Sequence, residues 1–136
     1  MKIRVINIFF CLILLGCKKG HTGDCFMSNG KDITEIRLPG YFNEVLVNDK
    51  IEVTIIRGNE NKVEITAPAN LMKNIHSEVV DGTLTLENKN TCNFVRGYKR
   101  KIKVKVTSPY YSKITNDGVG NVILSSGFTQ DTLVLR

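Results

Sequence analysis

Polar and apolar residues alternate along most of the chain after residue 31, which is the period-two pattern of half-buried β-strands. The segments that show it are Asp32–Leu38, Glu44–Asn48, Ile51–Arg57, Lys62–Thr66, His76–Val80, Thr83–Glu87 and Lys101–Thr107. They are rich in β-branched residues, which favour strands. The pattern predicts an all-β protein with one helical turn, within Ala67–Asn74.

Turn residues separate these strands. Gly58–Asn61 predicts a hairpin leading into Lys62–Thr66, and Asp81-Gly82 predicts a tight one. Nearer the end, Ile114 and Leu133 are 19 residues apart, close to one rung of a parallel β-solenoid. We expect Gly and Asn to form the corners of that rung because they accept positive φ.

The beginning of the chain has the pattern of an export signal. Met1–Arg4 is basic, and Val5–Leu15 is apolar but too short to cross a bilayer core of ~30 Å. Leu14-Leu15-Gly16-Cys17 resembles the lipobox of bacterial lipoproteins, in which the cysteine is acylated and becomes the first mature residue. The alternative is an ordinary secretory signal with an incidental cysteine. We predict a lipoprotein signal peptide over 1–16, a polar tether over 17–31 and one domain over 32–136.

Acyl chains such as palmitate on Cys17 would anchor the protein firmly, because two or three chains bind a bilayer far better than one. Lys18 is not the aspartate that commonly marks retention at the inner membrane, and no acidic run follows Cys17. We therefore expect attachment to the outer membrane, with the periplasmic face favoured over the surface.

Two of the four cysteines remain after export and lipidation, Cys25 and Cys92. In an oxidising compartment we expect them to form a disulfide. Two free thiols are the alternative. A metal site is not predicted, because the two cysteines have no CxxC spacing and no nearby histidine.

Three segments carry a family resemblance: EIRLPGYFNEVLVNDKIEVTIIRG, KVEITAPANLMKNIHSEVVDGTLTLEN and KIKVKVTSPYYSKITNDGVGNV. They resemble the auto-transporter adhesin "head GIN domain" family over about Thr34–Arg136. The matching elements are Phe42–Val45, Val53–Gly58, Ala67–Leu84, Lys101–Pro109 and Ile114–Val122. The segment NKNTCNFVRGYKRKIKV around Cys92 is similar to a lipoprotein subgroup.

This resemblance implies N-terminal antiparallel strands that lead into a right-handed parallel β-helix, or solenoid. It also implies a protein of the cell envelope with no established enzymatic activity. Members of the family usually continue beyond the point that corresponds to Arg136. The chain is therefore expected either to be truncated or to end in an open strand that can pair with another chain.

Length and composition fit a single globular domain: 136 residues, 42% hydrophobic and 24% charged. A net charge of +6 is too mild to indicate a nucleic-acid partner. In the densest basic stretch, Arg96, Tyr98 and Lys99 are candidates for binding an anionic glycan or a lipid headgroup. Lys101, Lys103 and Lys105 alternate with apolar residues, which favours the solvated face of a strand and protection of a sheet edge.

Other candidate chemistry is sparse. Asn116-Asp117-Gly118 is interpreted as a turn rather than a calcium loop, and Gly118-Val119-Gly120 as a corner rather than a phosphate-binding loop. Only His76 with Glu78 and Asp81 could form an acid–base cluster. No GxSxG or HExxH motif occurs, and no cofactor is predicted.

Together these observations predict a non-catalytic cell-envelope lipoprotein whose β-solenoid domain binds a partner in the manner of an adhesin. The alternatives are a small carbohydrate-active enzyme of β-helix type and a module that assembles end to end. The expected partners are the membrane through the lipid anchor, a glycan or envelope protein, and a second copy through the C-terminal strand. Nucleic acid is not expected.

Overall fold

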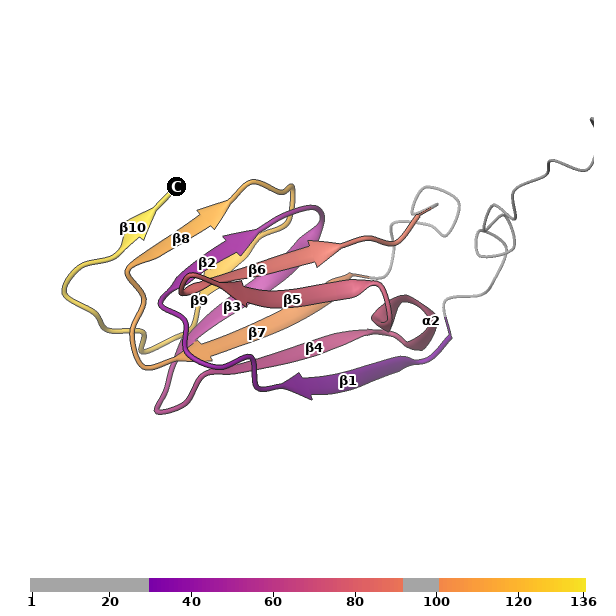
Figure 1. Ribbon diagram of the computed structural model, residues 1–136, viewed down its shortest axis with the longest axis horizontal. Helices are drawn as coiled ribbons and strands as arrows, with labels where there is room; N and C mark the ends of the chain where they lie inside the picture. The colour runs from indigo at the N-terminus through magenta and orange to yellow at the C-terminus, as the bar shows by residue number, and fades with distance from the viewer. Residues whose placement is uncertain (1–29, 92–100) are drawn as a thin grey trace, which may run out of the picture.

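The computed structural model describes residues 30–91 and 101–136, which form ten strands and one short helix (Figure 1). The strands are β1 (Asp32–Arg37), β2 (Glu44–Val47), β3 (Ile51–Arg57), β4 (Lys62–Pro68), β5 (Ile75–Val80), β6 (Thr83–Asn88), β7 (Ile102–Ser108), β8 (Lys113–Asn116), β9 (Val122–Leu124) and β10 (Val134–Leu135). The helix α2 covers Ala69–Met72. The all-β prediction and the position of the helical turn are confirmed.

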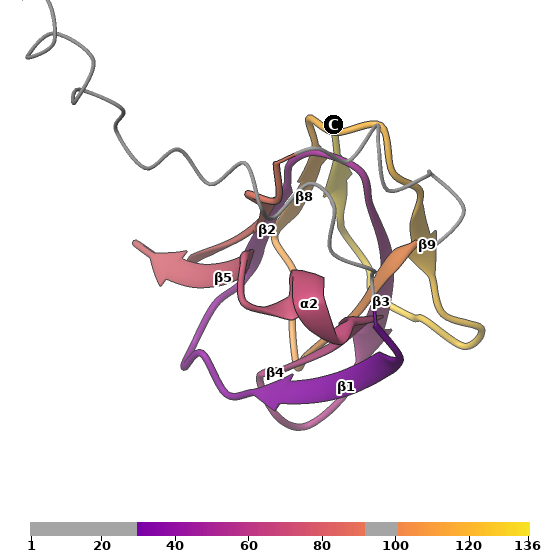
Figure 2. The ribbon, with the colours of Figure 1, turned by 90° about the vertical axis from the view of Figure 1, so that its right-hand side faces the viewer.

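The strands form two five-stranded sheets around one interior. One sheet has the order β1-β4-β7-β3-β9 and the other the order β10-β8-β2-β6-β5. Figure 2 views the strands nearly end-on, with α2 at the near end of the interior. The short helix joins β4 of the first sheet to β5 of the second.

Both sheets are mixed. In one, β6, β2, β8 and β10 are parallel neighbours, and in the other β7, β3 and β9 are. Each sheet ends in antiparallel strands on the side away from β9 or β10. In the first sheet β4 pairs with β7 and β1 pairs with β4, and in the second β5 pairs with β6. Within each parallel stack the order departs from chain order, because β2 lies between β6 and β8 and β3 lies between β7 and β9.

The two predicted hairpins have different outcomes. Asp81 and Gly82 have φ of 49° and 76° and join the antiparallel strands β5 and β6, as a type I′ turn requires. The hairpin predicted at Gly58–Asn61 is wrong, because β7 lies between β3 and β4 and pairs with both. A turn of this length can connect two adjacent strands or two strands that have a third strand between them. Its residues therefore do not identify the strand with which β3 pairs.

Alternation places the aliphatic side chains of both sheets in one core. In the stack β6-β2-β8, Leu84, Val45 and Ile114 are aligned and buried. In the facing stack Val104 and Val53 are aligned and buried in the same way. Each fully buried side chain of this kind contributes about 1.5–3 kcal/mol relative to an exposed one, so these rows are the main stabilising feature.

Arg37 closes the side of the interior between β1 and β5. Its Nη1 donates hydrogen bonds to the carbonyl oxygen of Ile75 at 2.8 Å and to Ser77 Oγ at 3.1 Å. Its Nε lies 2.6 Å from Glu35 Oε1. One side chain of the first strand therefore ties an edge of one sheet to an edge of the other.

The corner between β8 and β9 lies directly against the turn between β2 and β3. A Cβ at Gly118 would lie 1.9 Å from the carbonyl oxygen of Asp49, and one at Gly120 would lie 1.7 Å from that of Ile51. The predicted corner is confirmed, but the expected reason is wrong. Positive φ occurs at Asp49, whereas Gly118 and Gly120 are required because backbone approaches backbone.

Parallel pairing at Ile114, which the 19-residue spacing predicted, is present, but its register differs from the predicted one. β10 pairs in parallel with β8, and Leu135 rather than Leu133 lies opposite Ile114. Side chains alternate with a period of two, so a shift of two residues leaves Leu133 and Leu135 on the same face of the sheet.

We predict that Gly120→Ala lowers the free energy of unfolding by about 3 kcal/mol, because the added methyl group would overlap main-chain atoms that cannot move aside. Gly40→Ala is the control. Gly40 has φ of 89° and open space around it, so the substitution should cost only about 1 kcal/mol of backbone strain. Urea denaturation followed by circular dichroism measures both. Equal losses of stability in the two variants would contradict the prediction, because they would show that the corner adjusts to the added methyl group.

Tyr111 is the largest fully buried side chain. Its hydroxyl group lies 2.8 Å from the carbonyl oxygens of both Ile56 and Val106. The ring centroid of Phe128 is 6.0 Å away, and the side chain of Gln130 bonds to both main-chain polar groups of Tyr111. Burial raises the pKa of the Tyr111 phenol far above its usual value.

We predict that Tyr111→Phe lowers the free energy of unfolding by about 1–3 kcal/mol, because the phenol group no longer donates to the carbonyl oxygens of Ile56 and Val106, which share its one hydrogen atom. The raised pKa adds a pH dependence. The neutral phenol stabilises the fold below its unfolded pKa of about 10, and this contribution is lost as pH rises above that value. The variant should therefore lose less stability than the wild type above pH ~10.

The half-exposed neighbour supplies the control, since Tyr110→Phe removes a hydroxyl group outside the core and should leave the stability unchanged. Denaturant titrations at a series of pH values compare the three proteins. Parallel curves for the wild type and Tyr111→Phe would contradict the assigned role.

Candidate functional site

The outward side chains of the sheet β10-β8-β2-β6-β5 lie in rows that follow the strand pairing. Glu44 of β2 lies between Lys113 of β8 and Thr83 of β6. In the next row, Leu46 lies between Thr115 and Thr85. Since neighbouring strands are about 4.8 Å apart, the members of a row are within contact distance of one another.

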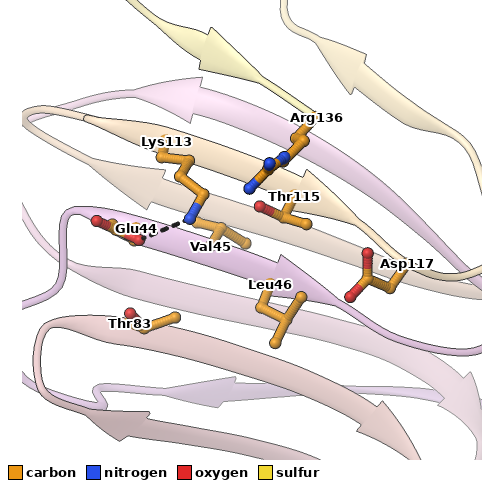
Figure 3. Close-up of a pocket in the computed structure, with 8 residues that line it drawn as sticks. All are labelled: Glu44, Val45, Leu46, Thr83, Lys113, Thr115, Asp117 and Arg136. Carbon is orange, nitrogen blue, oxygen red and sulfur yellow. Dashed lines mark ion pairs between the residues drawn. The ribbon is translucent and has the colours of Figure 1, made fainter.

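An open pocket of about 440 Å³ lies on this face. We call it the sheet-face pocket. Its lining residues are Glu44, Val45, Leu46, Thr83, Lys113, Thr115, Asp117 and Arg136 (Figure 3). They come from β2, β6 and β8, from the corner that follows β8, and from the residue after β10.

The charged groups of the sheet-face pocket balance. Lys113 Nζ lies 3.6 Å from Glu44 Oε2, and both side chains are more than one-third exposed. An exposed pair of this kind adds at most about 1 kcal/mol to stability, so it is available to exchange partners with a ligand. Asp117 and Arg136 supply one more carboxylate and one more cation. The lining is polar at its margin, and the charges of its four ionisable side chains sum to zero.

Main-chain hydrogen bonds hold the two margin residues in place. The N–H group of Asp117 donates to the carbonyl oxygen of Val47 at 2.9 Å, and that of Arg136 donates to Ile114 at 3.0 Å. Asn116 Nδ2 donates to the carbonyl oxygen of Gly120 at 3.0 Å, which fixes the corner beside Asp117. This contact supports the interpretation of Asn116-Asp117-Gly118 as a turn.

The site residues predicted from the sequence lie outside the described residues. This applies to Cys17 as the lipid attachment, to Cys25 and Cys92 as a disulfide, and to Arg96, Tyr98 and Lys99 as a ligand site. They stay predictions. The residues of the sheet-face pocket were not identified from the sequence, because no motif links them.

The lysine that precedes β7 and the two lysines within it point away from the core, as predicted. Ile102, Val104 and Val106 are buried, while Lys101, Lys103 and Lys105 are exposed beside them. The prediction that these lysines protect a sheet edge is wrong, because β7 lies in the middle of its sheet.

Ion pairs anchor two of these lysines. Lys101 Nζ lies 2.8 Å from Glu52 Oε2, and Lys105 Nζ lies 4.0 Å from Glu64 Oε1. The hydrogen bond from Lys101 lowers the pKa of the Glu52 carboxyl group. The contacts of these two lysines are those of a solvated strand face.

The three residues of the candidate acid–base cluster lie on β5 and in the turn that follows it. His76 and Glu78 lie on the exposed side of β5, opposite Glu87 and Thr85 of β6, and Asp81 lies in the following turn. None of the three lines the sheet-face pocket. In residues 30–91 and 101–136, no group of three or more His, Cys, Asp or Glu side chains is arranged to hold a metal ion. The same ranges contain no helix that is long and apolar enough to cross a membrane.

Comparison with solved structures found similar folds. A protein from Bacteroides fragilis described as "a putative adhesin" has a TM-score of 0.68 and 29% identity, over 77% of this chain and 48% of that one. A "putative adhesin" from Parabacteroides merdae has a TM-score of 0.60 and 23% identity, over 72% and 40%. A "putative lipid binding protein" from Parabacteroides distasonis has a TM-score of 0.57 and 21% identity, over 72% and 42%. The last two comparisons show a shared fold only.

The chain thus spans less than half of each of these three structures. No curated protein matched the sequence. One family model matched residues 41–136, which is more than half of the 136 residues. The chain therefore belongs to the family described as "Putative auto-transporter adhesin, head GIN domain".

Proposed function

We propose that the protein is a non-catalytic lipoprotein of the cell envelope whose β-domain binds a partner in the manner of an adhesin. The observation that carries this proposal is the family match over residues 41–136. The Bacteroides fragilis neighbour, also described as an adhesin, supports it. A carbohydrate-active enzyme is disfavoured because His76, Glu78 and Asp81 lie apart from the sheet-face pocket.

The anchored form follows from the sequence. The signal peptide of residues 1–16 is removed, Cys17 is acylated, and residues 17–31 connect the anchor to the domain of residues 32–136. The first strand begins at Asp32, directly after this tether.

The two parallel stacks support a β-helix interpretation of the domain. The chain passes from β2 to β3 and from β8 to β9, and each pair adds one strand to each stack. In this interpretation β6 with β7, β2 with β3, and β8 with β9 are three rungs of a right-handed β-helix, stacked in an order that differs from their order in the chain. The antiparallel strands β1, β4 and β5 lie at one end of it.

End-to-end assembly is a second candidate function, favoured by exposed apolar side chains on the edge strands β9 and β10. Ile123 and Leu124 are 46% and 39% exposed, and Val134 and Leu135 are 51% and 60% exposed. Both strands form the same end of the two sheets. An edge of this kind can pair with another chain.

We predict that Cys17→Ser abolishes lipidation and moves the protein from the membrane fraction to the soluble fraction of its native host. The wild type should lose residues 1–16 and gain the mass of a diacylglyceryl group, measured on the intact protein. Cys11→Ser, a change within the signal peptide, is the control and should leave both results unchanged. A wild-type protein that retains Met1 without an adduct would overturn the anchoring proposal.

For the remaining cysteines, we predict that wild-type protein denatured without reductant incorporates no alkylating reagent at Cys25 or Cys92, because both sulfur atoms are oxidised. Cys25→Ser should free Cys92 for labelling, and Cys92→Ser should free Cys25. Peptide mass spectrometry after alkylation measures each site. Labelling of both residues in the wild type would instead establish two free thiols.

A further inference from the structure

We propose that the sheet-face pocket binds a neutral sugar unit of a glycan. The inference rests on the proposed function of the domain as a binding module, and it names the site and the chemical class of the ligand. The pocket lies on the outer face of β2, β6 and β8, apart from the lysine row of β7 on the other sheet.

The balance of charges in the lining disfavours a ligand with a large net charge. Glu44 and Asp117 are opposed by Lys113 and Arg136, so the pocket carries two charges of each sign. An anionic ligand would gain attraction from the cations and lose it to the carboxylates at similar distances. A neutral ligand with many hydroxyl groups uses both signs, because each hydroxyl group donates to a carboxylate and accepts from a cation.

Two threonine hydroxyl groups extend this pattern. Thr83 lies beside Glu44 in one row, and Thr115 lies beside Leu46 in the next. A hydroxyl group donates once and accepts twice, so it matches the same groups on a sugar ring. The lining thus offers both donors and acceptors on neighbouring strands.

The centre of the sheet-face pocket is less polar than its margin. Leu46 supplies this apolar surface among the charged residues labelled in Figure 3, because Val45 is only 1% exposed and its side chain belongs to the core. Leu46 is half-buried and faces outward between Thr115 and Thr85. A pyranose ring has an apolar face of C–H groups and a polar rim of hydroxyl groups, and this arrangement matches both.

The lining is also held in place before any ligand arrives. Glu44, Thr83 and Lys113 lie on three hydrogen-bonded parallel strands whose inward side chains are fully buried. Preorganised groups reduce the entropy lost on binding. A volume of about 440 Å³ lies within the range of small-molecule sites.

The test uses the full-length protein in a polyoxyethylene detergent, which contains no sugar. Maltotriose, mannotriose and triacetylchitotriose are the neutral probes, trigalacturonate is the acidic probe and triglycine is the zwitterionic one. Titrations followed by amide NMR shifts locate and quantify binding. We expect at least one neutral sugar to shift the amides of β2, β6 and β8 saturably at millimolar concentration, and the other two classes to have no such effect.

Thr115→Val preserves side-chain shape and removes one hydroxyl group, and Asp117→Asn removes one charge. Each should weaken binding of the neutral sugar at least tenfold. Thr54→Val is the matched control. Thr54 lies on β3, between Ile123 and Lys105 on the outward face of the other sheet, so its substitution should leave the affinity unchanged. Preserved amide spectra show that the variants fold.

Several outcomes would overturn the proposal: no neutral probe shifts the pocket amides, trigalacturonate or triglycine binds there instead, or Thr115→Val and Asp117→Asn bind as well as Thr54→Val. The proposed function has a separate measurement, the attachment of native-host cells with and without the protein. Attachment that depends on the protein but not on Thr115 would reject the pocket and retain the adhesin-like function. Attachment that does not depend on the protein would reject that function even if the pocket binds sugar.

Discussion

The whole structure depends on keeping the aliphatic rows of neighbouring parallel strands aligned. Val45 between Leu84 and Ile114, and Val53 beside Val104, form facing parts of one core. A slip of one residue in either stack would turn buried valine and isoleucine side chains toward water and bring polar ones inside. The close backbone contact of Gly118 and Gly120 with the turn before β3 fixes the position of the corner that joins β8 to β9.

The same alignment builds the sheet-face pocket on the other side of the strands. Glu44 and Leu46 alternate with Val45 and Val47, so a strand that buries the two valines must present the other two side chains outward. Lys113 and Thr115 follow from Ile114 by the same rule. The binding surface and the core therefore share one backbone arrangement, while the outward side chains can change without disturbing the core.

The sequence predicted much of the local structure because alternation is a local signal. It located the strands β1 to β7, the turn at Asp81-Gly82 and the inward residues of β7. It could not identify strand partners, since the turn at Gly58–Asn61 is compatible with pairing β3 to β4 or with placing β7 between them. The pocket was missed for a related reason: Thr83, Lys113 and Arg136 become neighbours only through long-range pairing. The candidate loop residues Arg96, Tyr98 and Lys99 were visible as a basic and aromatic cluster, which is a signal of composition rather than of geometry.

Arg37 gives the first strand a mechanical role. A pulling force applied at Asp32 enters the domain along β1, which is paired with β4 at six positions. Through Arg37 part of the load passes to Ile75 and Ser77 of the other sheet. Peeling β1 away from β4 therefore also breaks the contacts that Arg37 makes with the other sheet.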